Sequence, residues 1–235
     1  GLPSSFLADP RNHRTRCSLA LLGPTGNVLV DCPPELRLQL LREDIHDLEA
    51  VLITHTHADH VMGMDDLRSF CLRYQAEIPV YTSPEYQEDI RRLFPYAFQE
   101  FPKGIWVPRF GLRDVEATMR LGGMEIETFW VEHGPVPVLG VKVGGFAYLT
   151  DVGHIPEEAW EKLQGLDTLV LDAVRYRPHP NHFHFDRAVE VALELRAGAT
   201  YFTHLCDDYD HGEVEAGLPP AIRPAYDGLR VEIEL

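Results

Sequence analysis

The chain has 235 residues, of which 45% are hydrophobic and 25% charged, proportions that are ordinary for a soluble globular protein. Its formal net charge of −16 argues against a broad electrostatic grip on duplex DNA or long RNA, because such binding relies on clustered Lys and Arg. No apolar run approaches the ~20 residues of a transmembrane helix, and no signal-peptide pattern is visible. We therefore expect a cytoplasmic protein with no membrane partner, folded as a single domain over residues 1–235.

The first half of the chain predicts a hairpin and then alternating helices and strands. A Gly-Pro-Thr-Gly turn at 23–26 joins two apolar runs, and Pro34 and Ser83 stand at expected helix starts. Pro95 should end the last of these helices. Strands are predicted at 16–22, 27–31 and 50–54, and helices at 34–42, 61–74 and 83–94.

The second half begins with residues 98–113, which mix aromatics with Pro and Gly and predict an irregular excursion. Strand patterns then alternate with helical ones, which predicts stacked sheets with helices outside. Strands are expected at 124–131, 138–143, 146–150, 168–172 and 200–204, and helices at 156–163 and 186–196.

Four candidate metal ligands occur within six residues, in the motif His55-Thr56-His57-Ala58-Asp59-His60, directly behind an apolar strand. In an extended turn the side chains at i and i+2 point the same way, so His55 and His57 can hold one ion while Asp59 and His60 face another. Imidazole and carboxylate suit zinc, manganese or iron, and the pKa of a zinc-bound water falls to about 7. The motif therefore predicts a two-metal hydrolytic site.

Three further ligand-type residues, His133, Asp151 and His204, also stand where an apolar strand gives way to a loop. The whole set, in this order, resembles the metallo-β-lactamase fold superfamily, an α/β class whose αββα sandwich packs two mixed sheets face to face with helices outside. The resemblance implies that His55, His57 and His133 hold one metal, that Asp59, His60 and His204 hold the other, and that Asp151 bridges them. It also implies that Asp31 supports these ligands through hydrogen bonds.

Residues 9–16, 177–184 and 224–228 resemble PhnP-type phosphodiesterases, which are similar to ribonuclease Z. The H-x-[ST] element of that family carries a catalytic histidine, and His182-Phe183-His184 stands in its place. An imidazolium there can neutralise transition-state charge and protonate a leaving oxygen. The resemblance thus implies catalytic roles for His182, His184 and Asp59, with the choice of principal acid between the two histidines left open. Arg175 and Arg177 are candidate phosphate ligands, and His211 is a candidate support for the metal ligands.

Taken together, these patterns predict a phosphodiesterase for small or cyclic phosphodiesters that attacks through a hydroxide on two divalent ions, with zinc expected and manganese the alternative. A ribonuclease Z-like RNA-processing nuclease is one rival, which the net charge disfavours. A glyoxalase II-like thioester or lactone hydrolase is another, and it needs no H-x-[ST] element.

Partners beyond the small substrate are not expected to include an extended nucleic-acid surface, and a homodimer is left open. The resemblance to PhnP also raises the extra structural zinc site of that family, which uses N-terminal cysteines and a His three residues after the last catalytic ligand. Residues 1–6 here contain no Cys and Asp207 stands three residues after His204, so no third, structural metal is expected. The four cysteines form no C-x-x-C pair, so we expect reduced, mostly buried thiols. The first strand of the fold is expected before residue 1.

Overall fold

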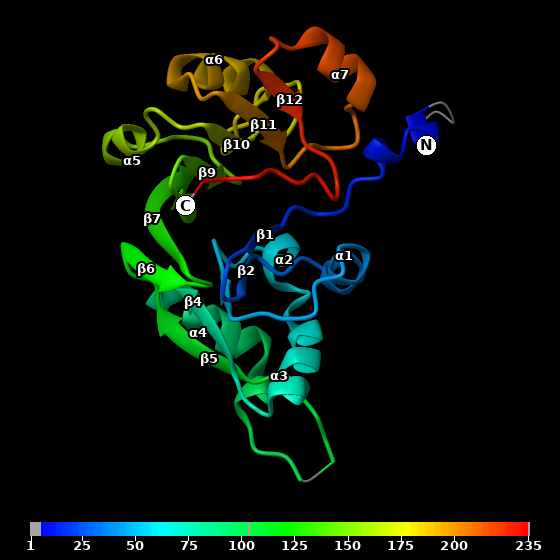
Figure 1. Cartoon of the computed structure of the whole chain (residues 1–235), viewed down its shortest axis with the longest axis vertical. Coiled ribbons are helices and arrows are strands. Elements are labelled where there is room, and N and C mark those ends of the chain that lie inside the picture. The colour runs from blue at the N-terminus through cyan, green and yellow to red at the C-terminus, as the bar shows by residue number, and fades with distance from the viewer. Residues whose placement is uncertain (1–5, 103, 235) are drawn as a thin grey trace. The chain divides into compact units, whose positions relative to one another are not determined.

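The computed structural model describes residues 6–102 and 104–234, and the chain divides into two compact units (Figure 1). The first unit is Arg16–Ile126, and the second comprises residues 6–15 and 127–234. The single domain over 1–235 stays a prediction. The expectations about thiols in residues 1–5 and about a strand before residue 1 fall outside the described residues.

The first unit is built on a five-stranded sheet in the order β1-β2-β3-β4-β5. The predicted hairpin is confirmed: β1 and β2 are antiparallel, with Leu19 opposite Val30, and the remaining neighbours are parallel. The strands are β1 (Leu19–Leu22), β2 (Asn27–Val30), β3 (Ala50–Leu52), β4 (Ile78–Thr82) and β5 (Phe110–Asp114).

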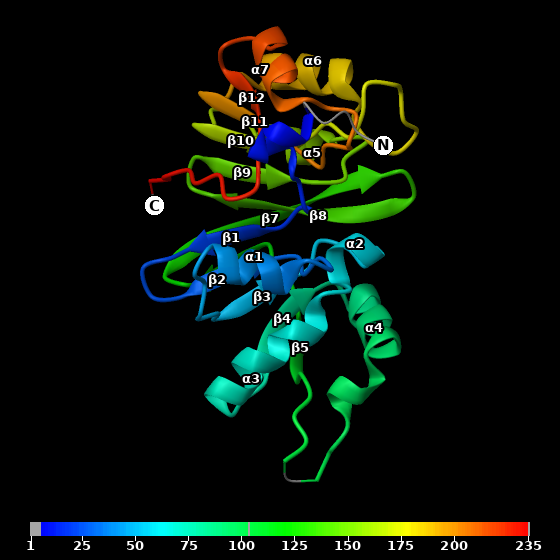
Figure 2. The same ribbon diagram turned by 90° about the vertical axis from the view of Figure 1, so that its right-hand side faces the viewer.

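Helices cover this sheet through one hydrophobic core that includes Leu36, Val51, Leu67 and Ile90 (Figure 2). The elements are α1 (Leu36–Arg42), α2 (Ala58–Val61), η3 (Met64–Leu67), α3 (Arg68–Tyr74), α4 (Pro84–Leu93) and η4 (Pro95–Phe98), where η marks a 3-10 helix. The Ser83 hydroxyl accepts a hydrogen bond from the backbone N–H of Tyr86, as expected of a cap.

The continuous helix predicted over 61–74 is wrong, because the structure breaks it at Gly63 into α2, η3 and α3. A Cβ atom at Gly63 would lie 1.9 Å from the carbonyl oxygen of Pro33. The Gly63 N–H donates to the Cys32 carbonyl at 2.9 Å, so the backbone here bonds to a neighbouring segment instead of continuing the helix.

A second sheet has the strand order β12-β11-β10-β9-β8-β7-β6. β6 and the first three residues of β7 belong to the first unit, and the rest of the sheet to the second. Strands β9 to β12 run parallel, whereas β7, β8 and β9 are antiparallel neighbours. The strands are β6 (Thr118–Leu121), β7 (Met124–His133), β8 (Val136–Val143), β9 (Phe146–Leu149), β10 (Thr168–Asp172), β11 (Ala199–Thr203) and β12 (Ile222–Pro224).

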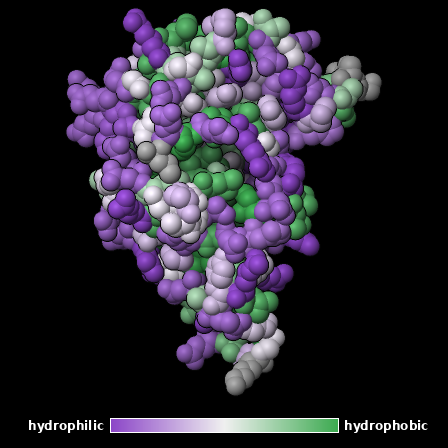
Figure 3. Space-filling model, viewed as in Figure 1, coloured by the Kyte–Doolittle hydropathy of each residue, from purple (hydrophilic) through white to green (hydrophobic). Residues whose placement is uncertain are grey.

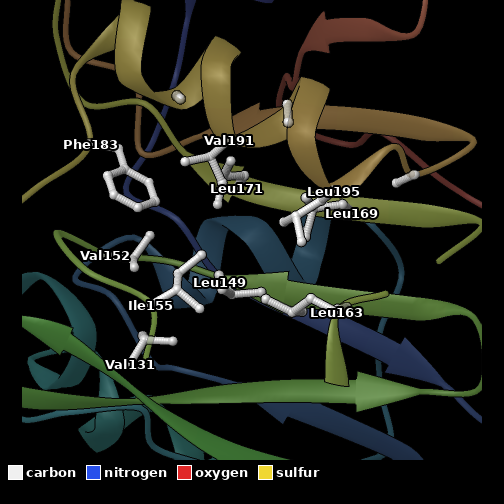
Figure 4. Close-up of a cluster of buried hydrophobic side chains, with 14 of the residues drawn as sticks. Val131, Leu149, Val152, Ile155, Leu163, Leu169, Leu171, Phe183, Val191 and Leu195 are labelled. Carbon is white, nitrogen blue, oxygen red and sulfur yellow. The ribbon is translucent and has the colours of Figure 1, made fainter. Parts of the chain in front are cut away.

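The second unit has its own core, in which helices pack on the sheet. Figure 4 shows Val191 and Leu195 of α6 beside Leu171 and Leu169 of β10, with Phe183 at the edge of the cluster. The helical elements are η1 (Phe6–Ala8), η2 (Pro10–Asn12), α5 (Glu157–Lys162), α6 (Phe185–Leu195) and α7 (His211–Gly217). The packed core therefore fixes the positions of the loops that follow the carboxyl ends of these strands.

The irregular excursion expected over 98–113 is partly wrong, since β5 begins at Phe110 and pairs in parallel with β4. The four cysteines form no disulfide, and Cys32 and Cys71 are buried. Among the helices in the described ranges, none combines the length and apolar character that crossing a membrane requires. Hydrophilic residues predominate on the face seen in Figure 3.

Candidate active site

The histidine-rich motif follows β3 and leads into α2, which begins at Ala58, three residues before the helix start predicted at 61. His57 has an extended backbone (φ −63°, ψ 150°) and precedes the first turn of α2, which carries Asp59 and His60. The ring centroid of His55 lies 4.5 Å from that of His57 and 4.3 Å from that of His60. The Asp59 carboxylate is 3.5 Å from Nε2 of His60. Three imidazoles and one carboxylate therefore form one cluster in the first unit.

Asp31, at the end of β2, sets the orientation of two of these rings. Its Oδ2 atom accepts from Nδ1 of His60 at 2.8 Å and from the Thr54 hydroxyl at 2.8 Å, and it is fully buried. Because the hydroxyl hydrogen of Thr54 goes to Asp31, the hydroxyl oxygen accepts from Nδ1 of His55 at 3.1 Å. Both imidazoles thus carry their proton on Nδ1, and Nε2 is the nitrogen that can bind a metal.

The second unit gathers the other predicted ligands at the ends of β7, β9 and β11. The Nε2 atom of His204 lies 3.5 Å from the Asp151 carboxylate, whose Oδ1 also accepts from the Thr150 hydroxyl at 2.7 Å. Nδ1 of His133 donates to the carbonyl oxygen of Asn181 at 2.9 Å. As in the first unit, a hydrogen bond fixes a tautomer and leaves Nε2 of His133 as the nitrogen with a lone pair available to a metal ion.

Three of these strand-end residues have left-handed backbone conformations: Asp31 (φ 65°), Asp151 (φ 50°) and His204 (φ 57°). This region is sparsely populated by residues other than Gly, and conformations of this kind persist where the surrounding structure enforces them, often at functional sites. The structure therefore holds three predicted site residues in strained geometry at the points where strands end.

His182 pairs with an acid that the sequence analysis did not select. Its Nδ1 atom donates to Oδ2 of Asp172 at 2.7 Å, and the same oxygen accepts the backbone N–H of Val152 at 3.0 Å. The Nε2 atom of His182 is 3.9 Å from Asp151, and its ring stacks on that of His204 at 5.0 Å between centroids. Burial raises the pKa of the Asp172 carboxyl, and the hydrogen bond from His182 opposes that rise. Asp172 thus orients His182 among the predicted ligands of this unit.

The other predicted site residues have different surroundings. His184 stands directly before α6, and its side chain makes no cap hydrogen bond. The Arg175 guanidinium donates to the carbonyl oxygens of Arg177 and Pro178, so it supports its own loop, while Arg177 is exposed. His211 begins α7, where its N–H donates to the Asn12 side chain and its ring packs on Tyr226, 5.7 Å away. The contacts found for these four residues within the described ranges do not include a predicted metal ligand.

Three residues near the predicted ligands were missed by sequence reasoning. Asp172 ends β10 in the same way that other ligand-type residues end their strands, and that position was the signal for it. Asn181 contributes only a backbone carbonyl, which no side-chain pattern reveals. Cys17 has its sulfur within 4.8 Å of a ring nitrogen of His60, but a lone Cys ahead of a strand carries no signal.

The donor sets fit divalent metal ions. In the second unit, ligand atoms of His133, Asp151 and His182 lie within 4.8 Å of one another, and so do those of Asp172, His182 and His204. In the first unit, two imidazoles have Nε2 as the lone-pair nitrogen. Neutral imidazole and carboxylate oxygen are ligands that zinc and manganese accept.

The family model described as a beta-lactamase superfamily domain matches residues 26–205, which include all seven predicted metal ligands. The chain belongs to the beta-lactamase superfamily. Its two mixed sheets with helices match the metallo-β-lactamase fold, which confirms the predicted fold class.

Known relatives confirm the resemblance to PhnP-type and ribonuclease Z-like proteins. The crystal structure of a new diphosphatase from the PhnP family matches with a TM-score of 0.90 and 36% identity, over 100% of this chain and 92% of that one. Ribonuclease Z of Gloeothece citriformis is 27% identical over 266 residues, covering 86% of this chain and 83% of the relative.

An octanoyltransferase of Porphyromonas gingivalis is 35% identical over 231 residues. This match covers 96% of the chain but 46% of the relative, so the chain spans about half the length of that protein.

Proposed function

We propose that the chain is a metal-dependent phosphodiesterase that hydrolyses small or cyclic phosphodiesters. One observation carries the proposal: His182, in the place of the family's H-x-[ST] histidine, is held by the buried carboxylate of Asp172. A thioester or lactone hydrolase of this fold does not need that histidine, whereas cleavage of a phosphodiester gains from an acid that protonates the leaving oxygen. The 36% identity to a PhnP-family diphosphatase supports phosphate chemistry.

We propose seven ligands for two divalent ions, with zinc as the expected metal and manganese as the alternative. They are His55, His57, Asp59 and His60 in the first unit and His133, Asp151 and His204 in the second. When bound, such ions supply an activated water and stabilise negative charge on the phosphoryl oxygens. Asp31, Thr54 and Asn181 fix the proton on Nδ1 of the imidazoles that they contact, so each Nε2 faces away from those partners.

His182 is proposed as the acid because of its hydrogen bonding. With Nδ1–H donated to Asp172, the only position left for a transferable proton on the ring is Nε2. The negative charge of Asp172 stabilises the protonated ring, which then gives the Nε2 proton to the departing oxygen. His184, at the start of α6, has no such acid partner among the described residues, so we assign the principal role to His182.

Cleavage of RNA is a second candidate, favoured by the match to ribonuclease Z over 83% of that protein. The net charge of −16 weighs against it, because each phosphate of a long RNA must be held against a negative surface. The name octanoyltransferase belongs to a protein about twice as long, and we do not extend that activity to this chain.

Hydrolysis assays with the zinc- and manganese-loaded protein test the proposal. The substrates are bis-p-nitrophenyl phosphate, a 2′,3′-cyclic nucleotide, a P–O–P diester, a precursor tRNA, a thioester and a lactone. We expect turnover of the small phosphate esters; turnover confined to the thioester or lactone would refute the proposal, and turnover confined to tRNA would favour the second candidate.

Two histidine variants give a matched comparison. His182→Ala should lower kcat by about 10²–10⁴-fold, the usual value of general acid–base help, at unchanged metal content. The kcat of His184→Ala, two residues away, should remain within about threefold of the parent. Loss of the general acid would lower kcat by orders of magnitude, and we do not assign that role to His184. The reverse order of effects would move the acid to His184.

A further inference from the structure

The loop between β10 and α6 contains a histidine whose ring is used as a backbone hydrogen-bond acceptor. Nδ1 of His179 accepts the backbone N–H of Asn181 at 3.1 Å and that of His182 at 3.2 Å. A ring nitrogen that accepts hydrogen bonds carries no proton, so the ring is neutral, with its hydrogen on Nε2. His179 therefore holds the backbone N–H groups of Asn181 and His182, the two residues that follow Pro180, on one acceptor atom.

Those two residues are the ones through which the loop acts on the candidate site. The carbonyl oxygen of Asn181 accepts from Nδ1 of His133, a proposed metal ligand. The side chain of His182, the proposed acid, bonds to Asp172. The ring centroid of His182 lies 4.3 Å from that of His133 and 4.7 Å from that of His179, so the three rings form one group.

We propose that His179 is a positioning residue that holds the metal ligand His133 and the acid His182 in register through the backbone of residues 181 and 182. The predicted effect of His179 on turnover rests on the proposed function. Its predicted effect on the orientation of the His133 and His182 rings does not. Without the Nδ1 acceptor, two N–H groups lose their partner and the turn loses the bonds that close it. The Asn181 carbonyl then no longer has a fixed position from which to orient His133.

The surroundings make this loop geometry specific. Pro178 and Pro180 flank His179 and restrict the backbone on either side. A Cβ atom at Gly153 would lie 2.5 Å from the carbonyl oxygen of Asn181, so the neighbouring backbone approaches this residue closely. The Phe183 N–H donates to the Val152 carbonyl at 2.6 Å and continues the same contact. The loop thus packs against the segment after Asp151, and His179 accepts hydrogen bonds from two of its backbone N–H groups.

The bonding pattern of His179 is that of an Asx turn. An Asn side-chain oxygen is attached to Cγ just as Nδ1 of His is, and it commonly accepts the N–H two residues further along the chain. Asn at position 179 should therefore keep the turn while removing the ring. Gln places its oxygen one bond further out, and Ala has no acceptor. The three substitutions separate the acceptor from the rest of the imidazole.

The experiment compares His179→Ala, His179→Asn and His179→Gln with the parent protein, each checked for folding by circular dichroism. Titration of the metal-free proteins with Zn²⁺ or Mn²⁺ should show affinity about 10–100-fold weaker for His179→Ala and His179→Gln, the usual cost of removing the support of a ligand. His179→Asn should stay within about threefold of the parent. Turnover of bis-p-nitrophenyl phosphate should follow the same order in kcat, with KM little changed.

Imidazole ¹⁵N spectra of the metal-free proteins give a readout that needs neither turnover nor metal. At a pH at which the rings are neutral, we expect His133 and His182 to show a single tautomer with the proton on Nδ1 in the parent and in His179→Asn. Tautomer averaging of both rings is expected in His179→Gln, and in His179→Ala if that variant folds.

Parent-like spectra and metal affinity in the folded Gln variant would overturn the proposal, as would failure of Asn to restore what Gln loses. If the parent lacks phosphodiester turnover, the proposed function fails while the spectra and titrations still decide the role of His179.

Discussion

Replacing Asp172 tests how much its hydrogen bond to His182 contributes to kcat, and the contacts of Asp172 allow the expected loss to be worked out. Both donors to this carboxylate, Nδ1–H of His182 and the N–H of Val152, bond to the same atom, Oδ2. In Asp172→Asn the amide oxygen can take the position of Oδ2 and accept from both donors. What is lost is the charge, and a hydrogen bond to a charged group is worth about 1.5–3 kcal/mol against about 0.5–1.5 for a neutral one. A difference of about 1–1.5 kcal/mol corresponds to roughly a tenfold lower kcat.

Asp172→Ala removes the acceptor altogether, so we expect kcat to fall as far as in His182→Ala, by about 10²–10⁴-fold. It also leaves the buried N–H of Val152 without its partner, at a cost of about 1–3 kcal/mol in unfolding free energy.

Steady-state kinetics with bis-p-nitrophenyl phosphate give kcat for the parent and each variant. Urea unfolding gives the range of urea concentrations over which each variant stays folded. The Asp172→Ala/His182→Ala double variant should be no slower than His182→Ala alone, because the two residues act as one group. An Asn variant as slow as the Ala variant, or a fully additive double variant, would refute this account.

Three further predictions concern other parts of the molecule. Gly63→Ala should lower the unfolding free energy by about 1–3 kcal/mol in urea titrations, because its Cβ would meet the Pro33 carbonyl, whereas Gly217→Ala, with nothing within 4 Å, should not; equal midpoints would contradict the proposed contact. The Arg11 guanidinium and the backbone N–H of residue 11 lower the pKa of Asp9 from 3.8 to about 2, so the stability from these bonds should be present above pH 3.8 and lost as the pH falls toward 2. A carboxyl ¹³C titration should give a midpoint near 2 that rises toward 3.8 in Arg11→Ala, which keeps the backbone bond, and an unchanged midpoint in that variant would exclude the Arg11 side chain as a cause. Asp31→Gly should weaken Zn²⁺ binding by about 10–100-fold, measured by chelator competition. Asp44→Gly, at an exposed residue that also has a positive φ of 57°, should match the parent; a parent-like Asp31→Gly would show that the ring orientations do not depend on Asp31.

Much of the fold could be predicted because the hydrophobic patterns in this chain agree with its turn chemistry. The hairpin of β1 and β2 follows from two apolar runs around a Gly-Pro-Thr-Gly turn, and α6 follows from an apolar stripe. The pattern failed where tertiary contacts decided the outcome. At Gly63 the backbone N–H bonds to the Cys32 carbonyl instead of continuing a helix that local propensity favours. β5, with a Gly and two charged residues, has little strand character and forms because β4 offers a parallel partner.

The candidate site shows the same division. A motif such as His55 to His60 is visible because its side chains carry the chemistry. Asp172 and His179 act through hydrogen bonds to other residues, and such partners depend on how loops fold back. The sequence also ranks His184 beside His182, although the structure gives the acid partner to His182.

The left-handed backbone at Asp31, Asp151 and His204 has a practical consequence for mutagenesis. Alanine is the usual choice for deleting a side chain, but at these positions it keeps the Cβ atom that makes a positive φ costly, by about 1–2 kcal/mol in L-residues. Glycine removes the ligand and adopts the same φ without that cost. Glycine variants are therefore the cleaner probes at these positions. The difference in unfolding free energy between the Gly and Ala variants at each position would measure the conformational cost of holding an L-residue at that positive φ.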